Sequence, residues 1–389
     1  MQLASVLDQY HDALQAKYGS RLLPGHLRAI DAIRRCRTPE AGELFVQCLD
    51  CGHSTWRPLS CGHRSCPQCQ NHEASLWLDR QQVKLLPVEY FMATFTLPYE
   101  IRFLAWDNQT LVYNLLFACV SSTLKDFGLN PKNLGANIGM TAILHTHNRR
   151  LDYHPHIHVV VPGGGVDEAR KQWKKKKDKY LFNEFALAKV FRARSLDALN
   201  KAGLSAPNSL PYKWVVDCTH VGKGLSALKY LSRYLYRGVI IENDIVSSQD
   251  GNVTFKYVES STGKTRYRTV KGEDFLWLVL QHVLPKGFRR VRDYGFLHGN
   301  AKKLLSLVQM VLQLLIEACA PRPRPVFECP KCQVSIKSWL SPGLPGHQDD
   351  KHAQMWQTLP FTQSQENASF MTQVHFSFSF FAGEGSRSP

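Results

Sequence analysis

The segment HPHIHVVVPGGG, at residues 154–165, constrains the fold more than any other part of the 389-residue sequence. Its valine run predicts a β-strand, and the Pro-Gly-Gly-Gly that follows predicts the end of that strand. Alternate side chains of a strand point to the same face, so His156 and His158 are expected side by side on one rigid element. Two such imidazoles can hold one divalent metal ion. Two other interpretations stay open at this point: the histidines could be a packing or surface pair, or they could belong to a zinc-hydrolase or cupin-type metal site.

Further strand and helix patterns set the fold class. Strand patterns accompany the histidine segment at FMATFTLP (91–98), TAILHT (141–146) and YKWVVDCT (212–219), with a hairpin at 252–270. Helical periodicity covers residues 1–45, 111–127 and 187–199, and returns from residue 301. Because the strands and helices do not alternate as regular βαβ units, we predict an α+β fold with a mostly antiparallel sheet flanked by helices.

The chain is strongly basic, with a formal net charge of +16 and a pI of about 9.4. This charge favours a polyanionic partner, nucleic acid ahead of an acidic membrane, over a basic surface without a partner. The run RKQWKKKK at 170–177 is predicted to be an exposed loop, in which Lys174 and Lys175 can contact phosphates. The N-terminal segment lacks the apolar stretch of a signal peptide, and residues 304–320 are predicted to form a buried or amphipathic helix rather than a membrane span. We therefore expect a cytoplasmic protein.

The cysteines are clustered, since five of the eleven lie between Cys48 and Cys69. Clustering in a chain of this size argues against the disulfide framework of a small secreted protein. Two CxxC pairs, Cys48 with Cys51 and Cys66 with Cys69, have the spacing at which two thiolates reach one tetrahedral zinc ion. We predict that these four residues form one structural zinc site.

Other cysteines leave alternatives open. Cys61 or His63 could replace one of the four zinc ligands, or could join Cys36 and His26 in a second site.

A further CxxC pair, Cys329 with Cys332, is followed by His347 and His352 at a spacing that suits a two-Cys, two-His zinc site. The segment before the histidines lacks the apolar helix that presents them in such a finger, so this site also stays open.

Two tyrosines give the histidine pair a chemical context. Tyr230 and Tyr234 are four residues apart in the predicted helix LSALKYLSRYLYR, so they share a face, with Cβ atoms about 5–6 Å apart. Basic neighbours favour an anion-facing surface: Lys229, Arg233 and Arg237. A phenol has a pKa of about 10, so it needs a nearby cation to attack a phosphodiester at neutral pH. The combination predicts transfer of a DNA strand onto tyrosine, which leaves a 5′-phosphotyrosine and a free 3′ hydroxyl.

With these motifs in this order, the chain resembles rolling-circle transposases of the HUH superfamily, in the family of two-tyrosine insertion-sequence transposases with an N-terminal zinc-binding domain. The resemblance spans residues 20–300 and rests on AIRRCRT, CLDCG, SCGHRSCPQCQ, LHT, HPHIHVVVPGGG, KYLSRYLYR and HVLPKGFRRVRDYGFL. It implies an HUH endonuclease-type antiparallel sheet, preceded by a small zinc-binding module and followed by a helical C-terminal region.

The resemblance also implies roles for individual residues. It makes three histidines the ligands of a catalytic Mg²⁺ or Mn²⁺, in addition to structural Zn²⁺: His156, His158 and, as the third ligand, His145. The nucleophiles are then Tyr230 and Tyr234, with Lys229 steadying phosphate or phenolate, and with Arg233, Arg237, Lys174 and Lys175 contacting DNA.

The expected substrate is single-stranded DNA at the element ends, in the bacterial cytoplasm, with the host replication machinery as a further partner. The alternatives are a plasmid rolling-circle replication initiator or relaxase, and a zinc-dependent DNA-binding regulator without catalysis. Along the chain we predict a helical and zinc-binding module, a catalytic domain, a C-terminal helix with the second CxxC segment, and a poorly ordered tail: residues 1–85, 86–300, 301–340 and 341–389.

Overall fold

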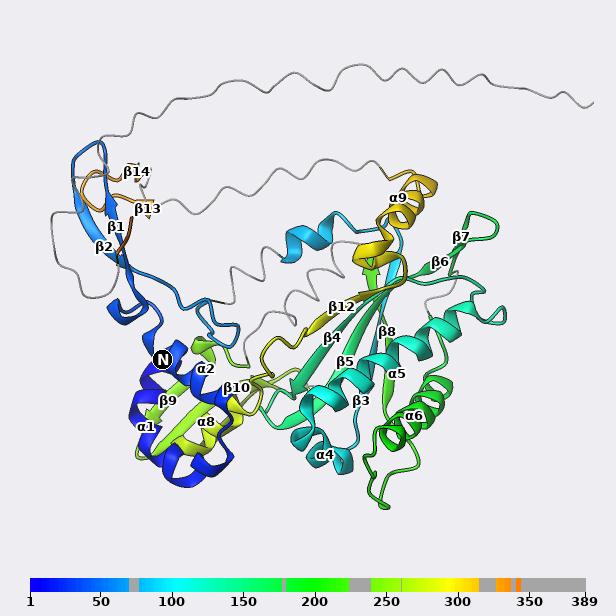
Figure 1. Cartoon of the computed structure of the whole chain (residues 1–389), viewed down its shortest axis with the longest axis horizontal. Coiled ribbons are helices and arrows are strands. Elements are labelled where there is room, and N and C mark those ends of the chain that lie inside the picture. Colours follow the sequence, from blue (N-terminus) through cyan, green and yellow to red (C-terminus); the bar gives the residue numbers. More distant parts are fainter. Residues whose placement is uncertain are drawn as a thin grey trace, which may run out of the picture. The chain divides into compact units, whose positions relative to one another are not determined.

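The structure is a computed structural model that describes residues 1–69, 77–176, 180–223, 239–259, 261–314, 327–336 and 341–343. Its α-helices are α1 Leu3–Tyr18, α2 Pro24–Arg35, α4 Arg102–Asp107, α5 Gln109–Leu129, α6 Glu184–Lys201, α8 Gly272–Leu280 and α9 Lys302–Val311 (Figure 1). The strands are β1 Glu43–Gln47, β2 Ser54–Pro58, β3 Glu89–Thr96, β4 Met140–His147, β5 Tyr153–Pro162, β6 Gly164–Asp167, β7 Gln172–Lys175, β8 Val216–Lys223, β9 Ile245–Gln249, β10 Asn252–Val258, β11 Thr265–Lys271, β12 Val291–Tyr294, β13 Phe327–Glu328, β14 Ser335–Ile336 and β15 Ser341–Gly343.

The central element is a five-stranded sheet in the order β12-β4-β5-β3-β8, in which every neighbouring pair is antiparallel. Three of the predicted strands correspond to β3, β4 and β5. The fourth begins later than predicted, at Val216. Trp214, two residues before it, packs edge-on against Phe191 of α6, with ring centroids 5.4 Å apart. The predicted α+β class with an antiparallel sheet and flanking helices is confirmed.

Helices α5 and α6 cover one face of this sheet (Figure 1). The side chains that meet them alternate along the strands, and Phe95, Leu144 and Ile157 are buried in the shared core. Phe95 packs edge-on against Phe191, with centroids 5.1 Å apart. Burial of each such side chain stabilises the fold by about 1.5–3 kcal/mol. Because side chains alternate along a strand, the burial of these residues determines which residues point to the opposite face.

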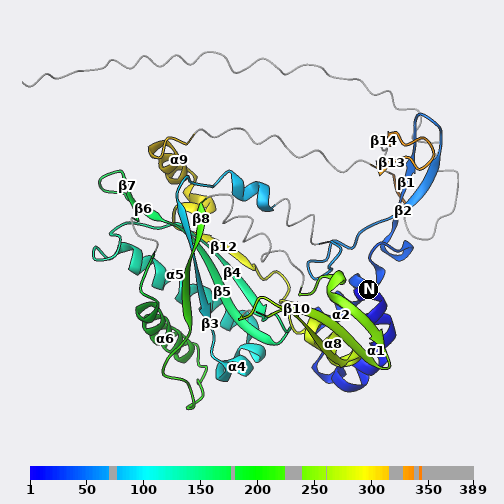
Figure 2. The same ribbon diagram turned by 180° about the vertical axis from the view of Figure 1, so that it is seen from behind.

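The N-terminal helices pack on a second core. Residues of α1 and α2 share it with α8, β9 and β10, and these elements lie together in both views (Figure 1, Figure 2). Tyr18 stacks on Trp277 at 4.8 Å, and its hydroxyl donates to Asp274 over 2.7 Å. The predicted hairpin at 252–270 is confirmed as β10 and β11. The predicted helical region at 1–45 is confirmed as α1 and α2, although strand β1 begins within it.

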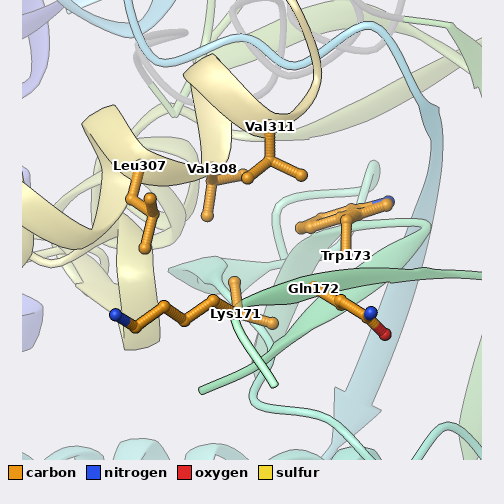
Figure 3. Close-up of a pocket in the computed structure, with 7 residues that line it drawn as sticks. Lys171, Gln172, Trp173, Leu307, Val308 and Val311 are labelled. Carbon is orange, nitrogen blue, oxygen red and sulfur yellow. The ribbon is translucent and has the colours of Figure 1, made fainter. Parts of the chain in front are cut away.

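The prediction that RKQWKKKK forms a loop is wrong, because β7 pairs with β6 in an antiparallel hairpin. Trp173 anchors this hairpin: its ring lies edge-on to Phe296, 5.8 Å away, and it packs beside α9. A small apolar pocket lies there, lined by Trp173 and by Val308 and Val311 of α9 (Figure 3). The lysines after Trp173 do not prevent a strand, because Lys174 pairs with Asp167 at 2.9 Å and Lys175 is exposed to solvent.

The predicted C-terminal helix is present as α9, and residues 315–320 of the predicted helix lie outside the described residues. The described residues after it form the short strands β13, β14 and β15. Among the helices that the structure describes, none combines the length and apolar character needed to cross a membrane. Most of the tail predicted at 341–389 also lies outside the described residues.

Gly295 sets the path of the chain after β12. Its φ of +61° lies in the left-handed region, and a Cβ there would come within 1.9 Å of the Ile138 carbonyl oxygen. Gly295→Ala should therefore lower the free energy of unfolding by more than about 2 kcal/mol, measured by urea denaturation. Gly299→Ala is the matched control, since a Cβ at Gly299 meets nothing within 4 Å. Equal stability of the two variants would contradict this role for Gly295.

Candidate metal centres and catalytic site

Three imidazoles meet on the face of the sheet opposite α5 and α6. His145 of β4 lies across from His156 of β5, and His158 follows two residues along β5 on the same face. One ligand nitrogen from each lies within 4.8 Å of the others, and the Nε2 atoms of His156 and His158 are 3.1 Å apart. Nitrogens bound at about 2.0–2.2 Å to one ion lie about 3–3.5 Å apart, so this pair has the spacing of ligands on a shared metal.

Neighbouring groups orient two of these rings. Nδ1 of His156 donates to the carbonyl oxygen of His154 over 2.6 Å, which leaves the lone pair on Nε2. Nδ1 of His158 lies 2.9 Å from the hydroxyl of Thr94, its partner in the β3–β5 register. The outer nitrogens are thus occupied, and both Nε2 atoms point to a common place.

Burial keeps the imidazoles neutral. It lowers the pKa of His156 to about 4 and, together with the nearby His156, the pKa of His158 to about 3. Burial also places the pKa of His145 well below its usual value, helped by His158 and Arg290. Since a metal binds the neutral imidazole, the donor set fits a divalent cation at neutral pH.

Two arginines that were not predicted as site residues lie beside the histidines. Arg102 belongs to none of the motifs, whereas Arg290 lies in the segment HVLPKGFRRVRDYGFL. A guanidinium nitrogen of Arg102 is 2.5 Å from Nδ1 of His154, and Nε of Arg290 donates to the Leu144 carbonyl over 3.1 Å. Both guanidinium groups act electrostatically on His156. The site therefore combines three neutral metal donors with fixed positive charge.

The structure describes only two of the other predicted catalytic and DNA-contacting residues, Lys174 and Lys175. Five of them lie outside the described residues: Lys229, Tyr230, Arg233, Tyr234 and Arg237. Lys174 pairs with Asp167 at 2.9 Å and donates to the Gly135 carbonyl, so its contacts stabilise the β6–β7 hairpin. Lys175 is exposed to solvent.

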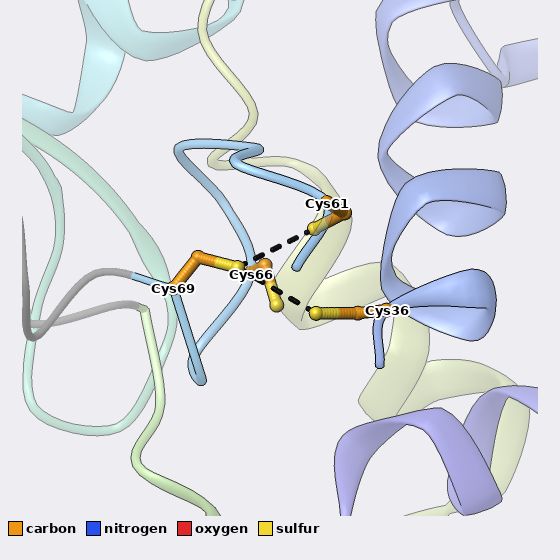
Figure 4. Close-up of side chains that lie close together, drawn as sticks. All are labelled: Cys36, Cys61, Cys66 and Cys69. Carbon is orange, nitrogen blue, oxygen red and sulfur yellow. Dashed lines mark hydrogen bonds between the residues drawn. The ribbon is translucent and has the colours of Figure 1, made fainter. Parts of the chain in front are cut away.

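The first cysteine set contains Cys36, Cys61, Cys66 and Cys69 (Figure 4). The Sγ atom of Cys69 is 3.5 Å from that of Cys36 and 3.6 Å from that of Cys61. Cys36 directly follows α2, and the other three lie in the segment after β2. Cys61, predicted as an alternative ligand, is thus brought to the Cys66–Cys69 pair.

The second set joins Cys48 and Cys51 with Cys329 and Cys332. The predicted combination of Cys48 and Cys51 with the Cys66–Cys69 pair is therefore corrected. The turn between β1 and β2 carries Cys48 and Cys51, and their thiols meet the C-terminal pair, at Sγ distances of 3.5 and 3.6 Å.

Four histidines considered as zinc ligands belong to neither cysteine set or lie outside the described residues. His63 is in neither set, and its Nδ1 accepts a hydrogen bond from the Ser65 amide over 3.2 Å. The ring of His26 lies against Trp106 and accepts a hydrogen bond from the Leu23 amide through Nδ1. His347 and His352 are outside the described residues.

Comparisons with known proteins agree with this arrangement. Residues 139–304 match a family model described as a putative transposase, and residues 6–97 match one described as a transposase zinc-binding domain. The putative transposase y4qJ of Sinorhizobium fredii (strain NBRC 101917 / NGR234) is 35% identical over 331 residues, which cover 79% of this chain and 83% of that protein. The chain belongs to this transposase family.

A second relative places the transposase among insertion-sequence proteins. The transposase for insertion sequence element IS801 of Pseudomonas savastanoi pv. phaseolicola is 28% identical over 286 residues, covering 67% of this chain and 68% of that protein. No solved structure matches the chain. The predicted membership of the insertion-sequence transposases with an N-terminal zinc-binding domain is confirmed, and DNA is the substrate class of such an enzyme. The cysteine sets agree with structural zinc.

The buried histidines should make the transposase lose stability in acid. Unfolded histidine titrates near 6.5 and folded His158 near 3, so the unfolded chain takes up the proton first as the pH falls. The stabilisation is present above pH 6.5 and is lost progressively below it, by about 1.4 kcal/mol per unit of pKa difference. Urea denaturation between pH 7.5 and 5 should show a shallower pH dependence in His158→Asn than in the parent.

The control for this experiment is His298→Asn, which removes an exposed histidine outside the sheet and should keep the parent's pH dependence. Loss of zinc in acid affects all three proteins alike. Identical pH dependences for His158→Asn and the parent would contradict the burial of this imidazole.

Proposed function

We propose that this transposase cleaves and rejoins single-stranded DNA at the ends of its element by attack of a tyrosine on a phosphodiester. The observation behind the proposal is that three neutral imidazoles, two of them oriented by neighbouring groups, converge on one face of the sheet in a chain of this family. Such a donor set leaves coordination positions open for phosphate oxygens, unlike a closed structural site. Both matched family models describe transposases, which favours this function over a replication initiator, a relaxase or a non-catalytic regulator.

In the proposed reaction, the phenol of Tyr230 or Tyr234 gives up its proton to water, and its oxygen forms a bond to phosphorus. The bond from phosphorus to the 3′ oxygen breaks, and that oxygen keeps the electron pair and takes a proton to become a 3′ hydroxyl. The 5′ phosphate stays on the tyrosine as a diester, so no ATP is needed for rejoining. Attack by another 3′ hydroxyl reverses the step, and the second tyrosine can meanwhile hold a second cleaved strand.

The chain's own groups have distinct tasks in this proposal. His145, His156 and His158 would hold Mg²⁺ or Mn²⁺, which, when bound, supplies positive charge to the non-bridging phosphate oxygens. Thr94 orients His158, and Arg290 adds fixed positive charge.

Several basic side chains would contact the DNA backbone. Lys229 would steady the phosphate or phenolate, and Lys175, Arg233 and Arg237 would track phosphates, as the net charge of +16 favours. The host replication machinery, which would fill the strand left behind, is the proposed further partner.

Replacement of both tyrosines tests the nucleophile. The parent, incubated with single-stranded DNA from the element ends and Mn²⁺, should form a covalent adduct that denaturing electrophoresis resolves. Tyr230→Phe/Tyr234→Phe removes both phenolic oxygens, so adduct should fall at least about 10³-fold. Tyr236→Phe, which changes a tyrosine in the same segment, is the control and should keep the adduct. Undiminished adduct in the double variant would overturn the proposal.

A histidine variant tests the metal role separately. His156→Ala removes a metal donor but no DNA contact, so cleavage should fall at least about 10²-fold while the Kd for the same DNA changes less than about threefold. His220→Ala is the control, because His220 lies in the same sheet but pairs with Glu89 at 2.7 Å. Cleavage by His156→Ala at the rate of the control would show that the histidine set does not serve the reaction.

A further inference from the structure

We propose that Cys48, Cys51, Cys329 and Cys332 form a second zinc site that fastens the segment after α9 to the N-terminal zinc-binding module. The four thiols come from segments far apart in the sequence, since Cys51 and Cys329 are separated by 278 positions.

The sulfur spacing matches a shared zinc ion. The Sγ atoms of Cys48 and Cys332 are 3.5 Å apart, and those of Cys51 and Cys329 are 3.6 Å apart. Thiolates bound at about 2.3 Å in a tetrahedron lie about 3.8 Å from one another, whereas a disulfide holds its sulfurs at about 2.05 Å. Four mutually close thiols thus have the arrangement of zinc ligands and not of two disulfides.

The two CxxC segments also share one backbone geometry. In each, the amide of the first cysteine, Cys48 or Cys329, donates to the carbonyl five residues later, over 2.8 and 2.9 Å. The carbonyl of that cysteine accepts from the amide four residues later, of Gly52 or Gln333, over 2.9 and 2.8 Å. Both of these residues have left-handed φ, +69° and +59°. A turn of this kind in two unrelated stretches of sequence indicates a common ligand.

Each turn sits at the end of a small hairpin, β1–β2 on one side and β13–β14 on the other. Cys48 and Cys329 are each only 1% exposed and pack around Val46. Burial of thiols at this spacing favours a bound cation, since thiolates brought together without one repel each other. Strand β15 also pairs with β1, so backbone bonds reinforce the same junction.

The first cysteine set shows why the second needs the C-terminal pair. Cys36, Cys61, Cys66 and Cys69 all lie within residues 6–97, the segment that matches the zinc-binding domain, and they complete four ligands there. Cys48 and Cys51 then supply only two of the four ligands that a closed zinc site needs. The missing two come from 329–332, outside both matched segments.

The test is a count of zinc in the full-length protein by mass spectrometry of the metal. Cys48→Ser/Cys51→Ser and Cys329→Ser/Cys332→Ser should each contain one zinc ion per chain fewer than the parent. The variant with all four replacements should also lack only one, because both pairs serve the same ion. Cys218→Ser changes a cysteine outside both sets and should keep the parent's zinc.

Two results would overturn the proposal: unchanged zinc in Cys329→Ser/Cys332→Ser, or loss of two ions in the fourfold variant. X-ray absorption at the zinc edge gives a readout that needs no cysteine replacement. The variant His156→Ala lacks a complete histidine set. It should contain two zinc ions per chain, and its absorption spectrum should show four sulfur neighbours per zinc at about 2.3 Å. One zinc per chain, or nitrogen among the neighbours, would contradict the second site.

Discussion

The register of β4 against β5 is the constraint on which the catalytic face depends. It places His145 directly across from His156, and His158 shares their face. A slip of one residue would turn either strand over and send its histidines into the apolar core. The opposite face prevents that slip, because Leu144 and Ile157 are buried against the helices. The same strand register therefore buries the core residues on one face and brings the three histidines together on the other.

The donor chemistry separates two kinds of metal site in this transposase. Each cysteine set offers four thiolates, which close a tetrahedron around zinc and leave no position for substrate. The histidine set offers three neutral nitrogens and leaves positions open. The thiolate sets therefore suit the structural zinc, and the imidazole set suits the catalytic ion that we propose. The arginines beside the histidines are half-buried and add positive charge where a phosphodiester would bind.

Much of this arrangement follows from sequence pattern, and some of it does not. Alternation in HPHIHVVVPGGG was enough to predict the strand and the shared face of His156 and His158. The contact of Thr94 with His158 depends on strand register, which no local pattern encodes. Likewise, CxxC spacing predicts each metal-binding turn but not which turns meet, and Cys48 meets the C-terminal pair through long-range folding. In the basic hairpin, the lysines indicate a loop, whereas the strand depends on the contact of Trp173 with Phe296, which is distant in sequence.

We propose that the three histidines hold one divalent ion at the sheet face. Mn²⁺ can report this directly, because electron spin echo spectroscopy detects the nitrogen nuclei of bound imidazoles. Mn²⁺ added to the zinc-loaded transposase should show histidine nitrogen couplings, and these should disappear in His145→Ala/His156→Ala/His158→Ala. A spectrum without nitrogen couplings, or couplings that persist in the triple variant, would contradict the claim.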